Sequence, residues 1–332
     1  MKIAVVGAGY AGLALSWNLL QFPEVQVSLF DGRGVAGGAS GVSTGLLHPY
    51  VAKRARPAHR FEEAMAAATS LINIAEETLG RTVALRSGVF RFAMTPEQME
   101  EFPQRPEYWN EEKVKEKFPQ ASSVPGLWIP SGMTVFSRPY LQGLFRAAEK
   151  KGAEFHREEI VSLDQLKGYD LVVLASGHEI LRFPECKDLP LKTRKGQALI
   201  CRIPASCGPL PCSIIGAGYL TLMEDSTLCQ IGSTYENEFD RDRAMALREK
   251  ISAFFPPARD FEVLQISSGV RIAQKLETVP LVQQIDERCW VFTGLGSRGL
   301  LYHALFGKEL AERLILGEGC EERSNPSLGL NV

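Results

Sequence analysis

The 332-residue chain has little that would tie it to a metal, a membrane or a disulfide framework. Its seven cysteines contain no Cys-x-x-Cys pair, and its five histidines show no spacing typical of metal ligands. An odd number of scattered cysteines indicates reduced thiols in a cytosol-like compartment. No apolar run is long enough to cross a bilayer, and no signal peptide precedes the first strand, which begins at residue 2. We therefore expect a soluble, cytoplasmic protein with no metal site and no membrane association.

Neither sign of charge dominates, because 37 Lys and Arg residues face 39 Asp and Glu residues. This balance gives no general attraction to nucleic acid, so RNA binding would depend on a local patch. One candidate patch is "VAKRARPAHR" (51–60), which holds Lys53, Arg54, Arg56 and Arg60. It is predicted either to meet RNA phosphates at the mouth of a site or to be a solvated surface before the helix at 61–80. The sequence leaves both interpretations open.

A dinucleotide-binding pattern opens the chain. "KIAVVGAGYAGLALSWNLLQF" is a β-branched run, then Gly7-x-Gly9-x-x-Gly12, then a helix. These glycines suit a tight turn, close approach to a pyrophosphate, and packing of helix on strand. A second strand, "VQVSLF", ends at Asp31, whose carboxylate can accept hydrogen bonds from a ribose. A second "GAGY" (216–219) lacks the third glycine and is predicted to be a turn between strands.

One further segment favours FAD over NAD, and two more are expected to lie beside the cofactor. "DGRGVAGGASGVSTG" (31–45) is a long loop of glycine and small residues, typical of flavoproteins, and it includes Ser40 and Gly45. The strand "YDLVVLASG" (169–177) ends in small residues, with Gly177 beside the expected cofactor. "WVFTGLGSRGLLYHALFGKELAERLILG" predicts a strand, a glycine turn and a helix. Helix-start amides beside the flavin would stabilise the negative charge that reduction places on its pyrimidine side. The residues of this turn are Gly294, Gly296, Ser297, Arg298 and Gly299.

Arg271 stands out in "SGVRIAQKLETVP" (268–280), where it lies among small and apolar residues. A guanidinium is costly to bury unless its donors meet an acceptor. Arg271 is therefore predicted either to pair with a carboxylate of the chain, such as Glu277 or Glu262, or to bind a carboxylate of a ligand.

Taken together, these segments resemble the D-amino acid oxidase / glycine oxidase superfamily of FAD enzymes. The resemblance also rests on "GGASGVSTGLLHP", "RKGQAL" (194–199), "YLTL…CQIGSTYE" (219–236) and "GLGSRGL". Within the superfamily, the chain most resembles the FAD-dependent C-terminal half of the MnmC family of tRNA wobble-uridine modification enzymes. The chain begins at the first cofactor strand, so it is expected to be a stand-alone oxidase without a methyltransferase half.

The resemblance implies an α/β fold, α+β overall, in which a Rossmann-type FAD-binding domain carries an antiparallel β-sheet cap. The FAD-binding domain would comprise residues 1–85, 140–182 and 265–332. The substrate or cap domain would comprise residues 86–139 and 183–264.

The resemblance also implies roles for individual residues. Arg271 would grip a substrate carboxylate, Tyr219 would lie over the flavin and contact the same group, and Arg298 would be close by. The implied reaction removes the carboxymethyl group of 5-carboxymethylaminomethyluridine in tRNA and releases glyoxylate. Some relatives carry a lysine thought to assist oxygen where this chain has Gln230, which puts rapid use of O₂ in doubt.

Two other functions remain open at this point. One is an oxidase or dehydrogenase of a free small amino acid or amine, such as glycine, sarcosine or a D-amino acid. The other is a flavin-binding scaffold without catalysis, which the combination of Arg271 and Tyr219 disfavours. The partner is accordingly tRNA or a small amine.

Overall fold

A computed structural model describes residues 1–51 and 54–317. One layer is a six-stranded sheet with strand order β11-β2-β1-β12-β19-β18. Its strands are parallel except β18, which runs antiparallel to β19. They are β1 (Lys2–Val6), β2 (Gln26–Phe30), β11 (Glu154–His156), β12 (Leu171–Leu174), β18 (Leu281–Asp286) and β19 (Cys289–Thr293). The buried, β-branched strand β1 lies near the centre, as expected for a parallel sheet covered on both faces.

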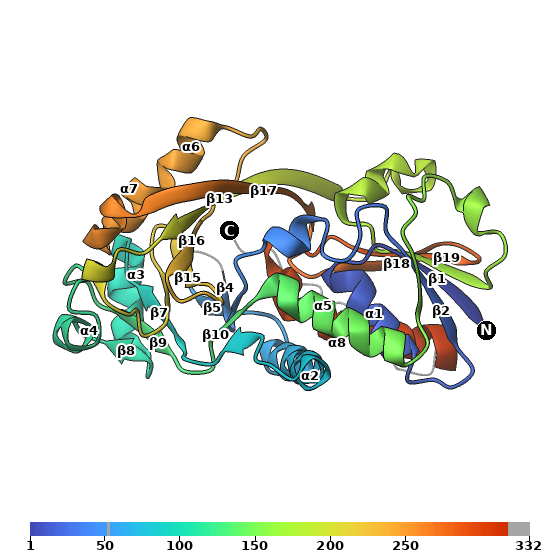
Figure 1. Cartoon of the computed structure of the whole chain (residues 1–332), viewed down its shortest axis with the longest axis horizontal. Coiled ribbons are helices and arrows are strands. Elements are labelled where there is room, and N and C mark those ends of the chain that lie inside the picture. Colours follow the sequence, from blue (N-terminus) through green and yellow to red (C-terminus); the bar gives the residue numbers. More distant parts are fainter. Residues whose placement is uncertain (52–53, 318–332) are drawn as a thin grey trace.

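Four long helices pack beside this sheet (Figure 1). They are α1 (Tyr10–Leu19), α2 (Phe61–Leu79), α5 (Ser137–Lys150) and α8 (Gly299–Leu316). Their apolar faces form one core with β1 and β2, and Leu13, Ile72, Leu144 and Leu301 belong to it. A second, smaller core covers the opposite face of the sheet with the segment around Phe183. The predicted Rossmann-type layer is therefore present.

The second layer is an eight-stranded, mostly antiparallel sheet with order β17-β13-β16-β15-β14-β7-β9-β8. Its strands are β7 (Val89–Phe92), β8 (Tyr108–Trp109), β9 (Gly126–Ile129), β13 (Leu191–Arg202), β14 (Ser213–Ile215), β15 (Tyr219–Leu222), β16 (Leu228–Gly232) and β17 (Glu262–Gln274). Its outer face is covered by α4 (Glu111–Lys117), α6 (Arg241–Met245) and α7 (Leu247–Ser252), which contribute residues to the core there. The remaining helix, α3 (Pro96–Glu101), leads into Phe102, which packs with Leu127 and Ile129 of β9. Phenylalanines such as Phe90, Phe92 and Phe254 fill the core on that side. The predicted α/β class with an antiparallel cap sheet is confirmed.

The long strands β13 and β17 connect the two layers (Figure 1). The predicted domain boundary at residue 265 falls within β17, which pairs with β13 along its length. The division into domains thus stays a prediction. The "GAGY" segment at 216–219 forms the predicted turn, here between β14 and β15.

Short elements complete the fold. The short strands are β3 (Leu46–Leu47), β6 (Ala84–Leu85), β10 (Met133–Val135), β4 (Tyr50–Val51) and β5 (Arg56–Pro57). The 3-10 helices are η1 (Ala39–Val42), η2 (Phe102–Gln104), η3 (Leu163–Leu166), η4 (Gly177–Arg182), η5 (Pro184–Cys186), η6 (Ala205–Cys207), η7 (Pro256–Asp260) and η8 (Gly296–Arg298).

The six cysteines within the described ranges are buried free thiols, and Cys320 lies outside those ranges. Within residues 1–51 and 54–317, no helix could span a membrane and no side-chain cluster is suited to a metal ion.

Candidate active site

The two layers line a cavity of about 900 Å³. The first layer contributes three segments to the lining, namely the loop that follows β1, the 3-10 helix η1 (Ala39–Val42), and the turn that precedes α8. The second layer contributes the inner faces of β13, β15 and β17. The volume lies toward the upper end of the usual range for ligand pockets, about 300–1,000 Å³. The cavity therefore has room for an extended ligand.

The glycine loop allows main-chain atoms to approach one another closely at one end of the cavity. Gly7 has φ of +115°, and a Cβ there would lie 2.4 Å from the carbonyl oxygen of Ala175. A Cβ on Gly12 would lie 1.8 Å from the carbonyl oxygen of Gly7. Glycine at these positions thus lets α1 begin at the cavity wall, where its N-terminus favours an anionic group. Gly7 and Gly9 line the cavity, whereas Gly12 lies behind it.

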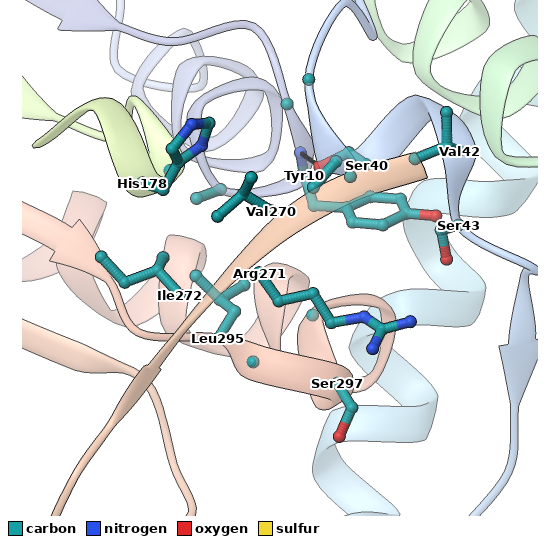
Figure 2. A pocket seen from close by; sticks show the side chains of 18 of the residues that line it. Tyr10, Ser40, Val42, Ser43, His178, Val270, Arg271, Ile272, Leu295 and Ser297 are labelled. Atoms are coloured by element: carbon teal, nitrogen blue, oxygen red, sulfur yellow. Dashed lines mark hydrogen bonds between the residues drawn. The ribbon is translucent and has the colours of Figure 1, made fainter. Parts of the chain in front are cut away.

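Ser40 and Asp31 also line this end of the cavity. The Ser40 hydroxyl accepts a hydrogen bond from the amide of Tyr10 at 3.1 Å (Figure 2). The Asp31 carboxylate accepts from the amides of Ala8 and Arg33, both at 2.9 Å. These bonds fix both side chains at the wall, and the remaining lone pairs of Asp31 can accept from a ligand hydroxyl.

Four of the other residues predicted to bind the cofactor line the cavity: Gly177, Gly296, Ser297 and Gly299. Gly45 and Gly294 do not line it. A Cβ at Gly45 would lie 1.8 Å from the carbonyl oxygen of Val135, so this glycine lets the loop pack against β10. The predicted strand, turn and helix near the C-terminus are confirmed as β19, η8 and α8.

Arg271 extends from β17 into the cavity (Figure 2). Its guanidinium donates to the Ser233 hydroxyl at 3.0 Å and to the Thr234 carbonyl at 3.4 Å. A Cβ on Gly196 would lie 2.7 Å from the guanidinium carbon, so the missing side chain makes room for the group. Among the described residues Arg271 forms no ion pair, and Glu262 pairs instead with Arg202 at 3.1 Å. Arg271 thus keeps donors for a carboxylate that the described protein does not supply.

Tyr219 and Arg298 line the same cavity. The Tyr219 ring packs over Gly232, where a Cβ would lie 2.5 Å from the ring, and this places it next to Ser233. Arg298 donates to the carbonyl of Thr278 at 2.6 Å. That bond holds part of the Arg298 guanidinium against the turn after β17. The three residues predicted to bind the substrate therefore line one cavity, although one guanidinium nitrogen of Arg298 is already bonded to the Thr278 carbonyl.

A second arginine, Arg91, was missed by the sequence reasoning. Cross-strand pairing across the cap sheet aligns one row of residues: Ser267, Ala198, Gly232, Tyr219, Ile215 and Arg91. Arg91 is only 7% exposed, lines the cavity and donates to the carbonyl of Tyr50 at 3.3 Å. Burial and the nearby charge of Arg105 lower the pKa of Arg91 to about 10, so it stays cationic near neutral pH. A single arginine within the apolar run "VFRF" (89–92) was the available signal.

His48 lies in the same part of the cavity wall. Burial, together with the positive charge of Arg91, lowers the pKa of His48 to about 4. His48 is therefore neutral near pH 7, and Arg91 and Arg271 are the cations of the cap strands that line the cavity.

The basic residues of the run at 51–60 differ in how their charges are used, because Arg60 is ion-paired whereas Arg54 and Arg56 are exposed. Arg60 forms ion pairs with Glu63 at 2.7 Å and Glu309 at 2.5 Å, so carboxylates of the protein neutralise its charge. Arg54 and Arg56 are exposed, and Lys53 lies outside the described residues. The adjoining Tyr50 and Val51 line the cavity, which places the run at its border. Its role in RNA binding stays a prediction.

Gln230 is held by interactions within the protein. Its amide donates to the carbonyl of Val42 at 3.2 Å and to the Ser267 hydroxyl at 3.3 Å. Gln230 thus ties the cap sheet to η1, which forms part of the cavity wall.

The model of one protein family, described as DAO, FAD dependent oxidoreductase, matches residues 2–313. The chain belongs to this family. The family description names FAD-dependent oxidoreductases, so the cofactor is FAD and the enzyme is an oxidoreductase. The residues present fit FAD, because a glycine loop, a helix N-terminus and Asp31 line one end of a long cavity.

Similar sequences include tRNA 5-methylaminomethyl-2-thiouridine biosynthesis bifunctional protein MnmC. The protein from Leptospira interrogans serovar copenhageni is 24% identical, over 95% of this chain and 57% of the relative. That from Marinobacter nauticus is 23% identical, over 96% of this chain and 56% of the relative. This chain thus spans just over half the length of these relatives.

Similar solved structures include glycine oxidase from Geobacillus kaustophilus, with a TM-score of 0.81, 20% identity and 94% of each chain covered. Iminodiacetate oxidase from Chelativorans sp. BNC1 gives a TM-score of 0.74, 19% identity and 95% of each chain covered. At these identities the likeness establishes the fold.

Proposed function

We propose that the protein oxidises a glycine-type secondary amine, namely 5-carboxymethylaminomethyluridine in tRNA. The products would be 5-aminomethyluridine and glyoxylate. The observation that carries the proposal is Arg271, a cation without an ion-pair partner among the described residues, which projects into the cavity beside Tyr219. A planar guanidinium is suited to bidentate binding of a carboxylate.

Bound FAD supplies the two-electron acceptor for a hydride from the carbon between amine and carboxylate. The amine nitrogen loses a proton, and this carbon and the nitrogen become an imine. Water then cleaves the imine to the free aminomethyl group and glyoxylate. The chain's own contribution is orientation, which lowers the barrier by holding the reacting carbon in place.

In this proposal Arg271 fixes the substrate carboxylate, and Ser233 and the Thr234 carbonyl fix Arg271. Tyr219, on β15 of the same sheet, limits the position of the amine. The likeness to MnmC supports a substrate carried on tRNA, as does a cavity whose border includes the segment before the exposed Arg54 and Arg56.

A second candidate is oxidation of a free small amine or amino acid. The likeness in fold to glycine oxidase and iminodiacetate oxidase favours this alternative. Arg271 serves both candidates equally, because each substrate presents a carboxylate one carbon from the amine.

Anaerobic titration of the FAD-loaded protein separates the two. An anticodon stem-loop bearing the carboxymethylaminomethyl group is expected to bleach the visible flavin absorbance, with glyoxylate released. The same stem-loop with unmodified uridine should leave the absorbance unchanged. Bleaching by glycine or sarcosine at lower concentrations than the RNA would overturn the tRNA assignment in favour of the second candidate.

A further inference from the structure

The segment from Ser233 to Phe239 leads from the cavity to the surface. Ser233 and Thr234 bind the guanidinium of Arg271. Tyr235, the next residue, also lines the cavity, yet 53% of it is exposed. Phe239 is 47% exposed. These two are the aromatic members of the exposed large hydrophobic residues in the described ranges.

A cationic side chain from strand β13 lies over each of the two rings. The Arg194 guanidinium carbon lies 5.8 Å from the centre of the Tyr235 ring, and the Lys195 ammonium lies 5.3 Å from that of Phe239. The arrangement is held in place, because Lys195 and Glu236 exchange main-chain hydrogen bonds at 2.8 and 3.0 Å. Exposed aromatic rings are thus interleaved with cations at the border of the cavity.

These cations keep their charge available. In the described part of the chain, no carboxylate lies within 4.0 Å of the Arg194 guanidinium or the Lys195 ammonium. Arg194 donates to the neutral amide oxygen of Asn237 at 3.0 Å. Two of the neighbouring acids, Glu236 and Asp240, are engaged elsewhere, since both pair with Arg243, at 2.5 and 3.4 Å.

Single-stranded nucleic acids are recognised by this combination, in which bases stack on aromatic rings and cations follow the phosphates. An amine substrate of a few atoms would be enclosed by the cavity and would not reach Phe239, which is not part of its lining. A protein partner would need a larger continuous apolar surface than two rings provide.

We propose that Tyr235 and Phe239 form a stacking platform for RNA bases next to the nucleotide that enters the cavity. Arg194 and Lys195 contact the adjoining phosphates. The inference deepens the proposed function and rests on it for the identity of the RNA.

Binding of a fluorescent anticodon stem-loop to the FAD-loaded protein, followed by anisotropy, tests the platform apart from turnover. Phe239→Ala is expected to raise Kd about 5- to 150-fold, the range for loss of one base–aromatic stack. Tyr235→Ala should have an effect in the same range. Leu264→Ala is the matched control, because Leu264 is exposed on β17 but does not line the cavity. Lys195→Gln should lower the slope of log Kd against log salt by about 0.7, as expected for one lost contact to single-stranded RNA.

Turnover provides the second readout, with the stem-loop and the free 5-carboxymethylaminomethyluridine nucleoside as matched substrates. Phe239→Ala should lower the ratio of kcat/KM for stem-loop over nucleoside, whereas Arg271→Lys should lower both values and preserve the ratio. Equal RNA binding by wild type and both aromatic variants, or no RNA binding, would overturn the platform. RNA binding that depends on the platform without any flavin bleaching would instead overturn the proposed function and leave the platform standing.

Discussion

The two ends of the cavity differ in the groups that line them, which are mainly main-chain groups at one end and long side chains at the other. At the cofactor end, main-chain groups and small residues form the wall, and glycines at 7 and 12 let segments approach closely. At the substrate end, long side chains project from one sheet, with Arg271 on β17, Tyr219 on β15 and Arg91 on β7. A main-chain wall suits a ligand that is the same in every turnover. A side-chain wall can change its specificity by single substitutions without altering the fold.

The largest expected effect at the substrate end is that of Arg271→Ala. Loss of a charge-assisted hydrogen bond costs about 1.5–3 kcal/mol, so kcat/KM for a glycine-type amine should fall roughly 10- to 150-fold. FAD content, read from the visible spectrum of the purified protein, should be unchanged, because the cofactor end does not depend on this side chain.

The matched control for this change is Arg202→Ala. Arg202 lies on β13 opposite Glu262 of β17 and forms an exposed ion pair with it. Such pairs contribute little to stability, so activity should match that of the wild type. Wild-type activity in Arg271→Ala itself would contradict the role of Arg271.

The cofactor end could be predicted from the sequence because its constraints are local. Gly7, Gly9 and Gly12 act within one strand–turn–helix unit, and the spacing between them carries the geometry. The substrate end depends on pairing between distant segments. Ser233 and Arg271, which form a hydrogen bond, are 38 residues apart in the sequence. The position of Arg91 in the cavity wall depends on how β7 pairs with β14.

For the same reason, the sequence could not show how the charges of the basic run (51–60) are paired. Arg60 pairs with Glu309, 249 residues away, and no local pattern could indicate that the charge is neutralised. Arg271 was found from sequence only because a cation among small and apolar residues is unusual by itself. Arg91 shows the same signal, because it lies within the apolar run "VFRF" (89–92).

Gly12→Ala tests the cofactor end. The added Cβ would meet the Gly7 carbonyl oxygen at 1.8 Å, so α1 must move away from the loop. We expect a loss of about 1–3 kcal/mol in the free energy of unfolding and weaker retention of FAD. Urea unfolding and the ratio of flavin to protein absorbance measure the two effects. Gly168→Ala is the control, since no atom lies within 4 Å of a Cβ there. Full retention of FAD by Gly12→Ala would show that the close approach is dispensable.

A buried histidine on α8 gives the cofactor layer a dependence on pH. His303 is fully buried, its ring bonds the Tyr140 hydroxyl at 2.5 Å, and burial lowers its pKa to about 4. Because the unfolded chain binds a proton near pH 6.5 and the folded chain does not, stability is lost as pH falls below 6.5. The loss from this residue between pH 6.5 and 5.5 should be about 1 kcal/mol. Urea unfolding over this range should show a shallower pH dependence for His303→Gln, and equal slopes would exclude His303 as the source.

The smallest expected effect concerns how Arg271 is held. Ser233→Ala removes the 3.0 Å bond to the guanidinium but leaves the Thr234 carbonyl in place, so Arg271 stays in the cavity with more freedom. One lost hydrogen bond contributes about 0.5–1.5 kcal/mol, which corresponds to a roughly 2- to 10-fold weaker grip on a carboxylate. The change should raise KM and the inhibition constant of acetate together, with kcat and FAD content nearly constant. Ser233→Thr, which keeps the hydroxyl, should restore both constants. A fall in kcat with an unchanged acetate constant would mean that Ser233 supports the sheet rather than the arginine, and that the substrate end relies on Gly196 and the strand pairing to orient Arg271.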